Sequence, residues 1–302
     1  MEQRRRIGAY GLCRERGRVL LTRSSDKSDF PGVWQVPGGG LEHGERPQDA
    51  VVREFLEETG LEISVVRPLT AMSSVRELRD IDLVWHFDLV VFEVEAVRGA
   101  LRAESAGTSD DVAWIPEEDL GDLRLMPFTA ELLGLPVEPL DFAAPHPLGP
   151  RRPPAPPSAD RGQRFAAYGL VTSPRGVLLT KISEGFPGAG KWHLPGGGTD
   201  FGEQPAAGLL RELAEESGQV GDVVALMSVS DSHNPRALGP EGYPIDWHAV
   251  RVTYRVVVDA PTEPRVAEVG GSTAEARWFG REEAVGLRLT DVAVAALPAW
   301  AS

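Results

Sequence analysis

The clearest pattern of hydrophobic and polar positions in the chain lies between Pro47 and Gly60. Proline suits the first position of a helix because its missing N–H would be unpaired there anyway, and glycine suits the left-handed residue just past a helix end. At about 100° per residue, the positions between them separate into two faces. Carboxylates share one arc and apolar side chains point the other way: Glu54, Glu57 and Glu58, and Val51, Val52 and Phe55. The pattern predicts a helix that packs its apolar face against a core.

The same stretch occurs a second time. Gly39–Leu61 and Gly197–Gln219 share a skeleton of Gly, five residues, Glu, seven residues and Arg-Glu-apolar-any-Glu-Glu-any-Gly. Pro205 and Gly218 predict the start and end of the second helix in the same way. A chance match of seven fixed positions is on the order of one in 10⁸. The skeleton positions are Gly39, Glu45, Arg53, Glu54, Phe55, Glu57, Glu58 and Gly60, and Gly197, Glu203, Arg211, Glu212, Leu213, Glu215, Glu216 and Gly218.

The remaining pattern follows the same repeat. Leu83–Val94 and Trp247–Val258 have the β-branched and aromatic content of strands. Each copy therefore predicts two strands, a glycine loop, the long helix, further strands and a carboxy-terminal helix, which is a mixed α/β order. Short helical turns are expected at Glu117–Leu120 and Glu282–Val285. Final helices are expected at Pro127–Leu133 and Thr290–Ala296.

A proline-dense segment separates the two copies. The stretch DFAAPHPLGPRRPPAPPSADRGQ, residues 141–163, favours an extended, semi-rigid spacer because such a composition prevents a packed core. A proline-rich ligand for a partner domain is the alternative. A chain of 302 residues is also long for one core. We therefore expect a first domain over residues 1–141, a linker over 142–162 and a second domain over 163–302.

Composition and charge narrow the class of protein. The net charge of −14 gives the chain no electrostatic attraction for long nucleic acids or anionic membranes. No stretch is long and apolar enough to span a bilayer, and the basic amino terminus lacks the apolar run of a signal peptide. Cys13 is the single cysteine, which excludes an internal disulfide, and it is expected in the core. A reducing cytoplasm is the expected compartment.

The carboxylate face of each helix is the candidate for chemistry. Three carboxylates on neighbouring turns repel one another, and a hard divalent cation with oxygen ligands would compensate. The glycine run before each helix lets backbone carbonyls and N–H groups approach a ligand. The alternative is a solvated acidic helix face with no function. The glycine loop, the arginine and the doubling favour the cation site.

The doubled skeleton resembles the signature of the Nudix hydrolases, in both halves of the chain outside the linker. The resemblance implies two α/β/α sandwiches with mixed β-sheets. It implies hydrolysis of a nucleoside diphosphate linked to another group, by attack of water on phosphorus. It also implies Mg²⁺ or Mn²⁺ as cofactor, a small nucleotide as substrate, and pairing of the two domains as an intramolecular pseudo-dimer.

Roles follow from the resemblance, residue by residue. Glu57 and Glu58 resemble metal ligands, and Glu54 resembles a further ligand or the base for water. The carbonyl of Gly38 resembles the backbone metal ligand of the family. Arg53 orients the glutamates, and a support role for the loop falls to the glutamate of the glycine loop. That glutamate is Glu45. In the second copy the same roles fall, in the order given, to Glu215, Glu216, Glu212, Gly196, Arg211 and Glu203.

A further carboxylate is expected in the loop before a late strand, as in many relatives. Glu104 and Glu268 stand ten residues before the matched tryptophans Trp114 and Trp278, so both are candidate metal ligands. Asp110 and Asp111 compete with the first of them and Glu275 with the second. An exposed loop acid without a role is the alternative for each.

Substrate choice lies outside the repeated skeleton, and three functions stay open. The leading one is hydrolysis of nucleoside di- or triphosphates, with nucleotide sanitation as one use. The others are cleavage of ADP-ribose or a nucleotide sugar, for which Pro235 is a weak pointer, and nucleotide sensing without turnover. The branch acting on oxidised guanine nucleotides carries asparagine in the last helix region, where this chain has Thr129 and Thr290, so residue identity does not support that substrate. Four tryptophans are expected in the core or stacked on a base: Trp34, Trp85, Trp192 and Trp247.

Overall fold

The computed structural model describes residues 1–104, 107–141, 146, 149, 151, 158–238, 244–267 and 270–301. The chain forms two compact units. Unit 1 comprises Met1–Gln163 together with Asp231–His248, and unit 2 comprises Arg164–Ser230 together with Ala249–Ser302. Most of the expected linker lies outside the described residues, so its conformation stays a prediction.

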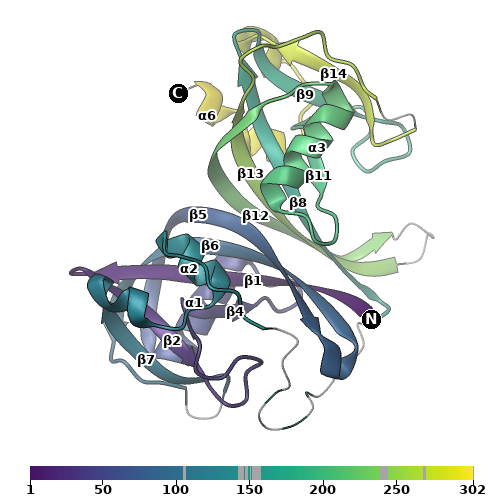
Figure 1. Cartoon of the computed structure of the whole chain (residues 1–302). Helices are drawn as coiled ribbons and strands as arrows, with labels where there is room; N and C mark the ends of the chain where they lie inside the picture. Colours follow the sequence, from purple (N-terminus) through teal and green to yellow (C-terminus); the bar gives the residue numbers. More distant parts are fainter. Residues whose placement is uncertain are drawn as a thin grey trace. The chain divides into compact units, whose positions relative to one another are not determined.

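The first half forms a mixed sheet. Within the described residues it has seven strands in the order β3-β2-β1-β6-β5, with β4 paired to β1 and β7 paired to β2 (Figure 1). β1 and β6 run parallel, from the pair Glu2 and Leu83 to the pair Cys13 and Val94, and the other pairings are antiparallel. The strands are β1 (Glu2–Glu15), β2 (Arg18–Ser24), β3 (Trp34–Gln35), β4 (Gly38–Gly40), β5 (Leu61–Leu78), β6 (Leu83–Gly99) and β7 (Ser109–Pro116).

The helices of the first half agree with the sequence pattern except for one short 3₁₀ helix, Arg79–Ile81, which the pattern did not predict. They are α1 (Pro47–Thr59), the 3₁₀ helices η1 (Arg79–Ile81) and η2 (Glu117–Asp122), and α2 (Pro127–Leu133). α1 ends at Gly60 with φ of 73°, the left-handed conformation that glycine adopts without steric cost. It packs against β1, β4 and β5 (Figure 1). This packing brings the polar face of α1 to the glycine strand β4.

The second half repeats this topology. Within its described residues, the strand order is β10-β9-β8-β13-β12, with β11 paired to β8 and β14 paired to β9. Its strands are β8 (Arg161–Ser173), β9 (Gly176–Ile182), β10 (Trp192–His193), β11 (Gly196–Gly198), β12 (Asp222–Leu238), β13 (Pro244–Val257) and β14 (Thr273–Phe279). Its helices are α3 (Pro205–Ser217), α4 (Arg281–Val285), α5 (Asp291–Ala296) and α6 (Pro298–Ala301). The prediction of two α/β domains with mixed sheets is therefore confirmed.

The apolar face of α1 is narrower than predicted. Val51 and Phe55 are fully buried, whereas Val52 is 36% exposed. The prediction that Val52 faces the core is therefore wrong, because its position on the helix falls on the flank between the two faces. Phe55 packs so closely that a Cβ on Gly11 of β1 would lie 2.4 Å from its ring. A glycine at that strand position lets the helix approach the sheet.

Cys13 and Gln219 are two buried residues of the interior. Cys13 is a free, buried cysteine in β1, as expected. Gln219, where the repeated skeleton of the first copy has Leu61, is 2% exposed. Its amide donates to the Ser217 carbonyl and the Thr262 hydroxyl and accepts from the Thr262 N–H, so the buried polar group is satisfied.

None of the described helices combines the length and apolar character that crossing a bilayer requires.

Candidate active site

Glu58 is held at the junction of α1 with β4. Its carboxylate is 4% exposed and accepts hydrogen bonds from the Gly38 N–H at 3.0 Å and the Ser109 hydroxyl at 2.8 Å. Burial raises the pKa of Glu58 to about 7 despite these hydrogen bonds, and the charges of Glu54 and Glu104 act in the same direction. A cation beside the carboxylates would remove this penalty. The donor set is made of oxygens, which fits a hard divalent ion.

Arg53 joins the acidic side chains into one network. Its guanidinium donates to both oxygens of Glu45 at 2.8 Å, to Glu54 at 2.8 Å and to Glu57 at 3.4 Å. It also donates to the Gly40 carbonyl at 3.2 Å. These hydrogen bonds raise the pKa of Arg53 well above its ordinary value. A planar fork of five donors is the group that can serve several carboxylates at once.

Glu54 lies directly beneath the glycine strand. A Cβ on Gly39 would lie 2.7 Å from its carboxylate, so a larger residue at position 39 would displace it. Burial raises the pKa of Glu54, and the hydrogen bond from Arg53 opposes the shift. Glu57 is the most exposed of the three acids, with 52% of its side chain accessible. The three carboxylates therefore present a graded face, from buried Glu58 to open Glu57.

The second half builds the same network. Gly196 donates its N–H to Glu216 at 2.9 Å, and the Thr273 hydroxyl hydrogen-bonds to the other oxygen of Glu216. Arg211 donates to Glu203 and to the Gly198 carbonyl. It also donates to two helix glutamates, at 3.0 and 3.1 Å, namely Glu212 and Glu215. The structure thus brings together, in each half, every predicted residue of the repeated skeleton that carries charge.

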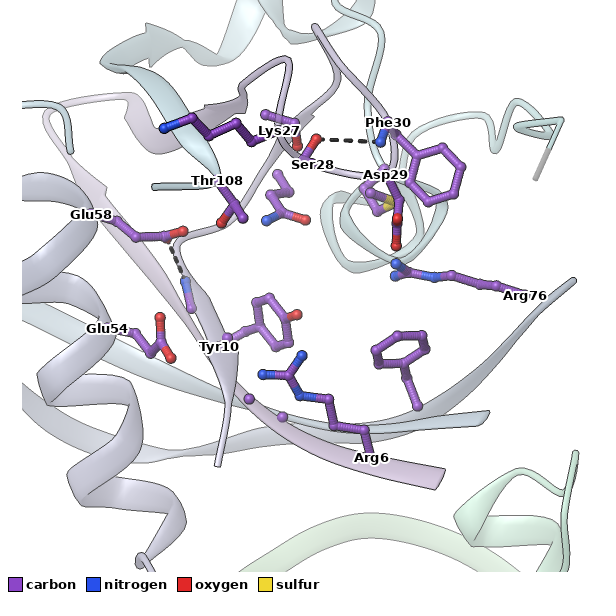
Figure 2. A pocket seen from close by; sticks show the side chains of 18 of the residues that line it. Arg6, Tyr10, Lys27, Ser28, Asp29, Phe30, Glu54, Glu58, Arg76 and Thr108 are labelled. Carbon is purple, nitrogen blue, oxygen red and sulfur yellow. Dashed lines mark hydrogen bonds between the residues drawn. The ribbon is translucent and has the colours of Figure 1, made fainter. Parts of the chain in front are cut away.

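A cavity of about 350 Å³ opens beside the first of these sites. Glu54 and Glu58 line one side of it, and cationic and aromatic side chains line the others (Figure 2). The guanidinium carbon of Arg76 lies 4.3 Å from the ring centre of Phe87 and 5.6 Å from that of Phe30. Cation–π contacts of this kind fix a guanidinium in place. The other charged and aromatic lining residues include Arg6, Tyr10, Lys27 and Asp29.

These cavity residues were not identified from the sequence. Arg6 could have been, because Arg164 matches it at the offset of the repeat and each arginine lies against the third glycine of its loop, Gly40 or Gly198. Ser109 and Thr273 also match, as hydroxyl residues that hold the buried glutamate. Tyr10 matches Tyr168 at the same offset, whereas Lys27 and Asp29 correspond to Gly185 and Pro187, so the repeat gives no signal for these two.

The loop carboxylates have different surroundings. Glu104 lies close enough to Glu58 to raise its pKa. Asp110 and Asp111 instead pair with Arg23, at 2.9 and 3.7 Å. In the second half, Glu275 lies 3.9 Å from Lys181 on an exposed edge, and Glu268 lies outside the described residues. The surroundings favour Glu104 among the candidates of the first half.

Three of the four tryptophans pack in the two cores, and the two threonines hydrogen-bond to the backbone. Trp34 and Trp85 pack against the core of the first half, and Trp192 is 9% exposed against Phe279. Trp247 is half-buried, and the ring is close to Gly162. Two threonines serve the backbone, because Thr129 accepts from the Val36 N–H and Thr290 from the Ala293 N–H. The core interpretation is therefore favoured for Trp34, Trp85 and Trp192.

Comparison with known proteins gives a family match in both halves. The family model described as the NUDIX domain matches residues 2–134 and 162–298. The nucleoside triphosphatase NudI of Enterobacter sp. (strain 638) is 32% identical over 121 residues, which are 39% of this chain and 80% of that protein. A MutT-like protein of Streptomyces ambofaciens is 31% identical over 135 residues, 45% of this chain and 76% of that protein.

Solved structures match over similar lengths. The MutT NUDIX hydrolase from Burkholderia pseudomallei has a TM-score of 0.38 and 24% identity, and the match covers 43% of this chain and 97% of that one. The NUDIX domain of NrtR from Shewanella oneidensis, in complex with ADP-ribose, has a TM-score of 0.38 and 20% identity, with 49% and 91% covered.

Proposed function

This chain belongs to the Nudix family by the match of both its halves, and from that premise we propose that each half is a separate, divalent-cation-dependent pyrophosphohydrolase centre for nucleotides. The observation that carries the proposal is the pair of matching acid networks. In each, one arginine holds three glutamates beside a glycine strand, and a fourth glutamate is buried behind them. Such a network is self-repelling unless a cation binds.

The first site would hold the cation with oxygens from Glu57, Glu58, the Gly38 carbonyl and Glu104. The cation, when bound, would supply positive charge that polarises the phosphoryl oxygens and acidifies bound water. Glu54 is a further ligand or the base that takes a proton from the attacking water. Its raised pKa, which results from burial, brings this carboxylate closer to neutral pH and so suits a base.

The remaining residues of the first site position and bind. Arg53 fixes the carboxylates of Glu54 and Glu57, and Glu45 fixes Arg53 in turn. Arg6 and Lys27 line the cavity and would bind substrate phosphates, since both are cations beside the proposed cation site. The corresponding group in the second half comprises Gly196, Glu203, Arg211, Glu212, Glu215, Glu216 and, in the loop, Glu268.

Cation dependence is tested by chelation. Removal of divalent ions should abolish turnover, and Mg²⁺ or Mn²⁺ should restore it, because the carboxylate face needs a cation to bind a polyanion. Full activity in excess chelator would contradict the assignment. We propose that Mg²⁺ is the ion used in the cell, because the donor set consists of oxygens only.

Two independent centres are tested by single and double variants. Glu57→Gln should silence the first site and Glu215→Gln the second, by orders of magnitude, since each 1.4 kcal/mol of lost transition-state stabilisation is about a factor of ten. The double variant should be inactive. If either single variant removes all activity on a substrate, the other half does not act on that substrate.

The substrate class we propose is nucleoside di- or triphosphates. The support is the relative named a nucleoside triphosphatase and the cluster of cationic side chains in the first cavity. A screen of nucleotides with Mg²⁺, scored for phosphate and pyrophosphate release, tests it. Cleavage of ADP-ribose alone would assign the other branch, and binding without hydrolysis of any nucleotide would assign a sensor.

Pairing of the halves and the compartment also remain proposals. Pairing is favoured because Asp231–His248, which belongs to the second repeat by sequence, is part of unit 1. Residues 1–141 and 163–302, co-expressed as two chains, should co-purify, and independent elution would contradict pairing. A cytoplasmic location is proposed from the single free cysteine, Cys13.

A further inference from the structure

A second group of metal-ligating side chains lies in unit 1, separate from the glutamates of the helix. His43 comes from the loop between β4 and α1, and His233 and Asp246 come from β12 and β13, in the segment Asp231–His248. One ligand atom from each of the three lies within 4.8 Å of the others. Side-chain exposures of 16%, 35% and 27% leave the group partly open to solvent. An ion could therefore reach it.

Both imidazoles direct the same atom at the same oxygen. Nε2 of His43 lies 3.2 Å from Oδ1 of Asp246, and Nε2 of His233 lies 2.6 Å from it. In a tetrahedral site with metal–ligand distances of about 2.0–2.2 Å, neighbouring ligand atoms are about 3.3 Å apart. The observed separations of 3.2 and 2.6 Å lie within about 0.7 Å of that value.

Hydrogen bonding within the group accounts for only one of the two imidazoles. His233 hydrogen-bonds to Asp246. His43 Nε2 is buried and, within the described part of the chain, makes no hydrogen bond of good geometry, although Oδ1 of Asp246 lies 3.2 Å away. A buried polar atom whose hydrogen bonding is incomplete is unfavourable. A cation between the three side chains would take the lone pair of this nitrogen and remove that cost.

The surroundings hold the three ligands in place. The ring centre of His248, which is fully buried, lies 5.7 Å from that of His43 and 6.0 Å from that of His233. Its Nδ1 accepts the N–H of Gly44, so its own proton sits on Nε2 and it offers no lone pair to a metal. A Cβ on Gly44 would lie 2.7 Å from the His233 ring. His248 and Gly44 therefore shape the site without binding the ion.

We propose that His43, His233 and Asp246 form a binding site for a divalent transition cation of the Zn²⁺ class. Two imidazole nitrogens and one carboxylate are a donor set for Zn²⁺ or Co²⁺, with a fourth position open to water. Mg²⁺ prefers an all-oxygen set, so the proposed site and the helix carboxylates select different ions. The ion would fasten the loop that carries Glu45 to the β12–β13 segment.

Of the two repeated loops, only the first supplies a ligand to this group. At the position of the second repeat that matches His43, the chain has Phe201, which has no metal-binding atom. His43→Phe therefore places in the first loop the residue that the same loop of the second repeat already carries. It is a conservative way to remove a ligand.

The test is Zn²⁺ binding to the full chain by calorimetry in saturating Mg²⁺, which occupies the helix carboxylates. We expect one Zn²⁺ per chain. His43→Phe and Asp246→Asn should each weaken binding at least about tenfold, the lower end of what loss of a supporting group costs at metal sites. His146→Gln, which changes a histidine outside the group, should bind as the wild type does.

Two further measurements separate a metal site at these three residues from Zn²⁺ binding elsewhere on the chain. Co²⁺ bound to the wild type should give the visible absorption of a tetrahedral site, and His43→Phe should lose it. Thermal unfolding without metal checks that the His43→Phe variant is folded. If that variant does not fold, His233→Gln, which changes a more exposed ligand, takes its place in both measurements. Equal Zn²⁺ affinity in wild type and His43→Phe would overturn the proposal, as would loss of Zn²⁺ binding when Mg²⁺ is added.

Discussion

Replacement of Arg53 by lysine tests whether the guanidinium positions the catalytic glutamates. The change keeps the positive charge and removes the planar fork. Lysine can still pair with Glu45, but one ammonium cannot also donate to Glu54 and to the Gly40 carbonyl, which Arg53 reaches at 2.8 and 3.2 Å. The variant therefore isolates geometry from charge.

The magnitude follows from the hydrogen bond to Glu54. A hydrogen bond to a charged group contributes about 1.5–3 kcal/mol. Because 27% of the Arg53 side chain is exposed, solvent screening reduces this to about 1–2 kcal/mol. If the loss appears in the transition state, kcat at the first site should fall about 5- to 30-fold. The concentration of Mg²⁺ for half-maximal rate should rise as well, since Glu57 loses its partner.

The assay uses a background in which Glu215→Gln silences the second site, with the best substrate and saturating Mg²⁺. Arg211→Lys in a Glu57→Gln background is the mirror experiment, and its effect should be similar because its hydrogen bonds match at 2.9–3.1 Å. Arg98→Lys, in an exposed pair with Glu62, is the control that should change nothing. A kcat for Arg53→Lys within twofold of its background would refute the positioning role.

Three further outcomes are expected. Burial, with the charge of Arg251, lowers the pKa of His193 to about 4 from 6.5, so its unfolded form binds more protons between these values. Stability should therefore fall by up to about 3 kcal/mol as pH drops from 6.5 through 4, and denaturant titrations of His193→Gln should show a flatter profile. Gly38→Ala should lower Tm and first-site activity, because φ is 142° and a Cβ would meet backbone at 2.4 Å, whereas Gly121→Ala has open space. By the same thermal assay, Phe55→Ala should lower the free energy of unfolding by about 3–5 kcal/mol and Val52→Ala by far less. Equal losses of stability for Gly38→Ala and Gly121→Ala, or for Phe55→Ala and Val52→Ala, would contradict these expectations. A pH profile of stability that His193→Gln leaves unchanged would contradict the first.

The sequence by itself determined the repeated part of the molecule. Proline and glycine set the ends of α1 and α3, and the period of the apolar residues set their buried faces, since both signals are local. The doubling then identified Arg53 and its glutamates, because chance does not repeat a charged skeleton. The two-domain α/β fold followed from the same alignment of the copies.

Only the tertiary structure decided what lies around these elements. Val52 fell on a helix flank, which the mean angle per residue does not resolve from the core face. Arg76 reaches the first cavity from β5 and stacks on aromatic residues of other segments, and no local spacing encodes that meeting. His43 and His233 are far apart along the chain and come within reach through β12 and β13. Contacts of this kind depend on long-range packing, which a single sequence does not display, whereas helix ends and periodicity depend on neighbours only.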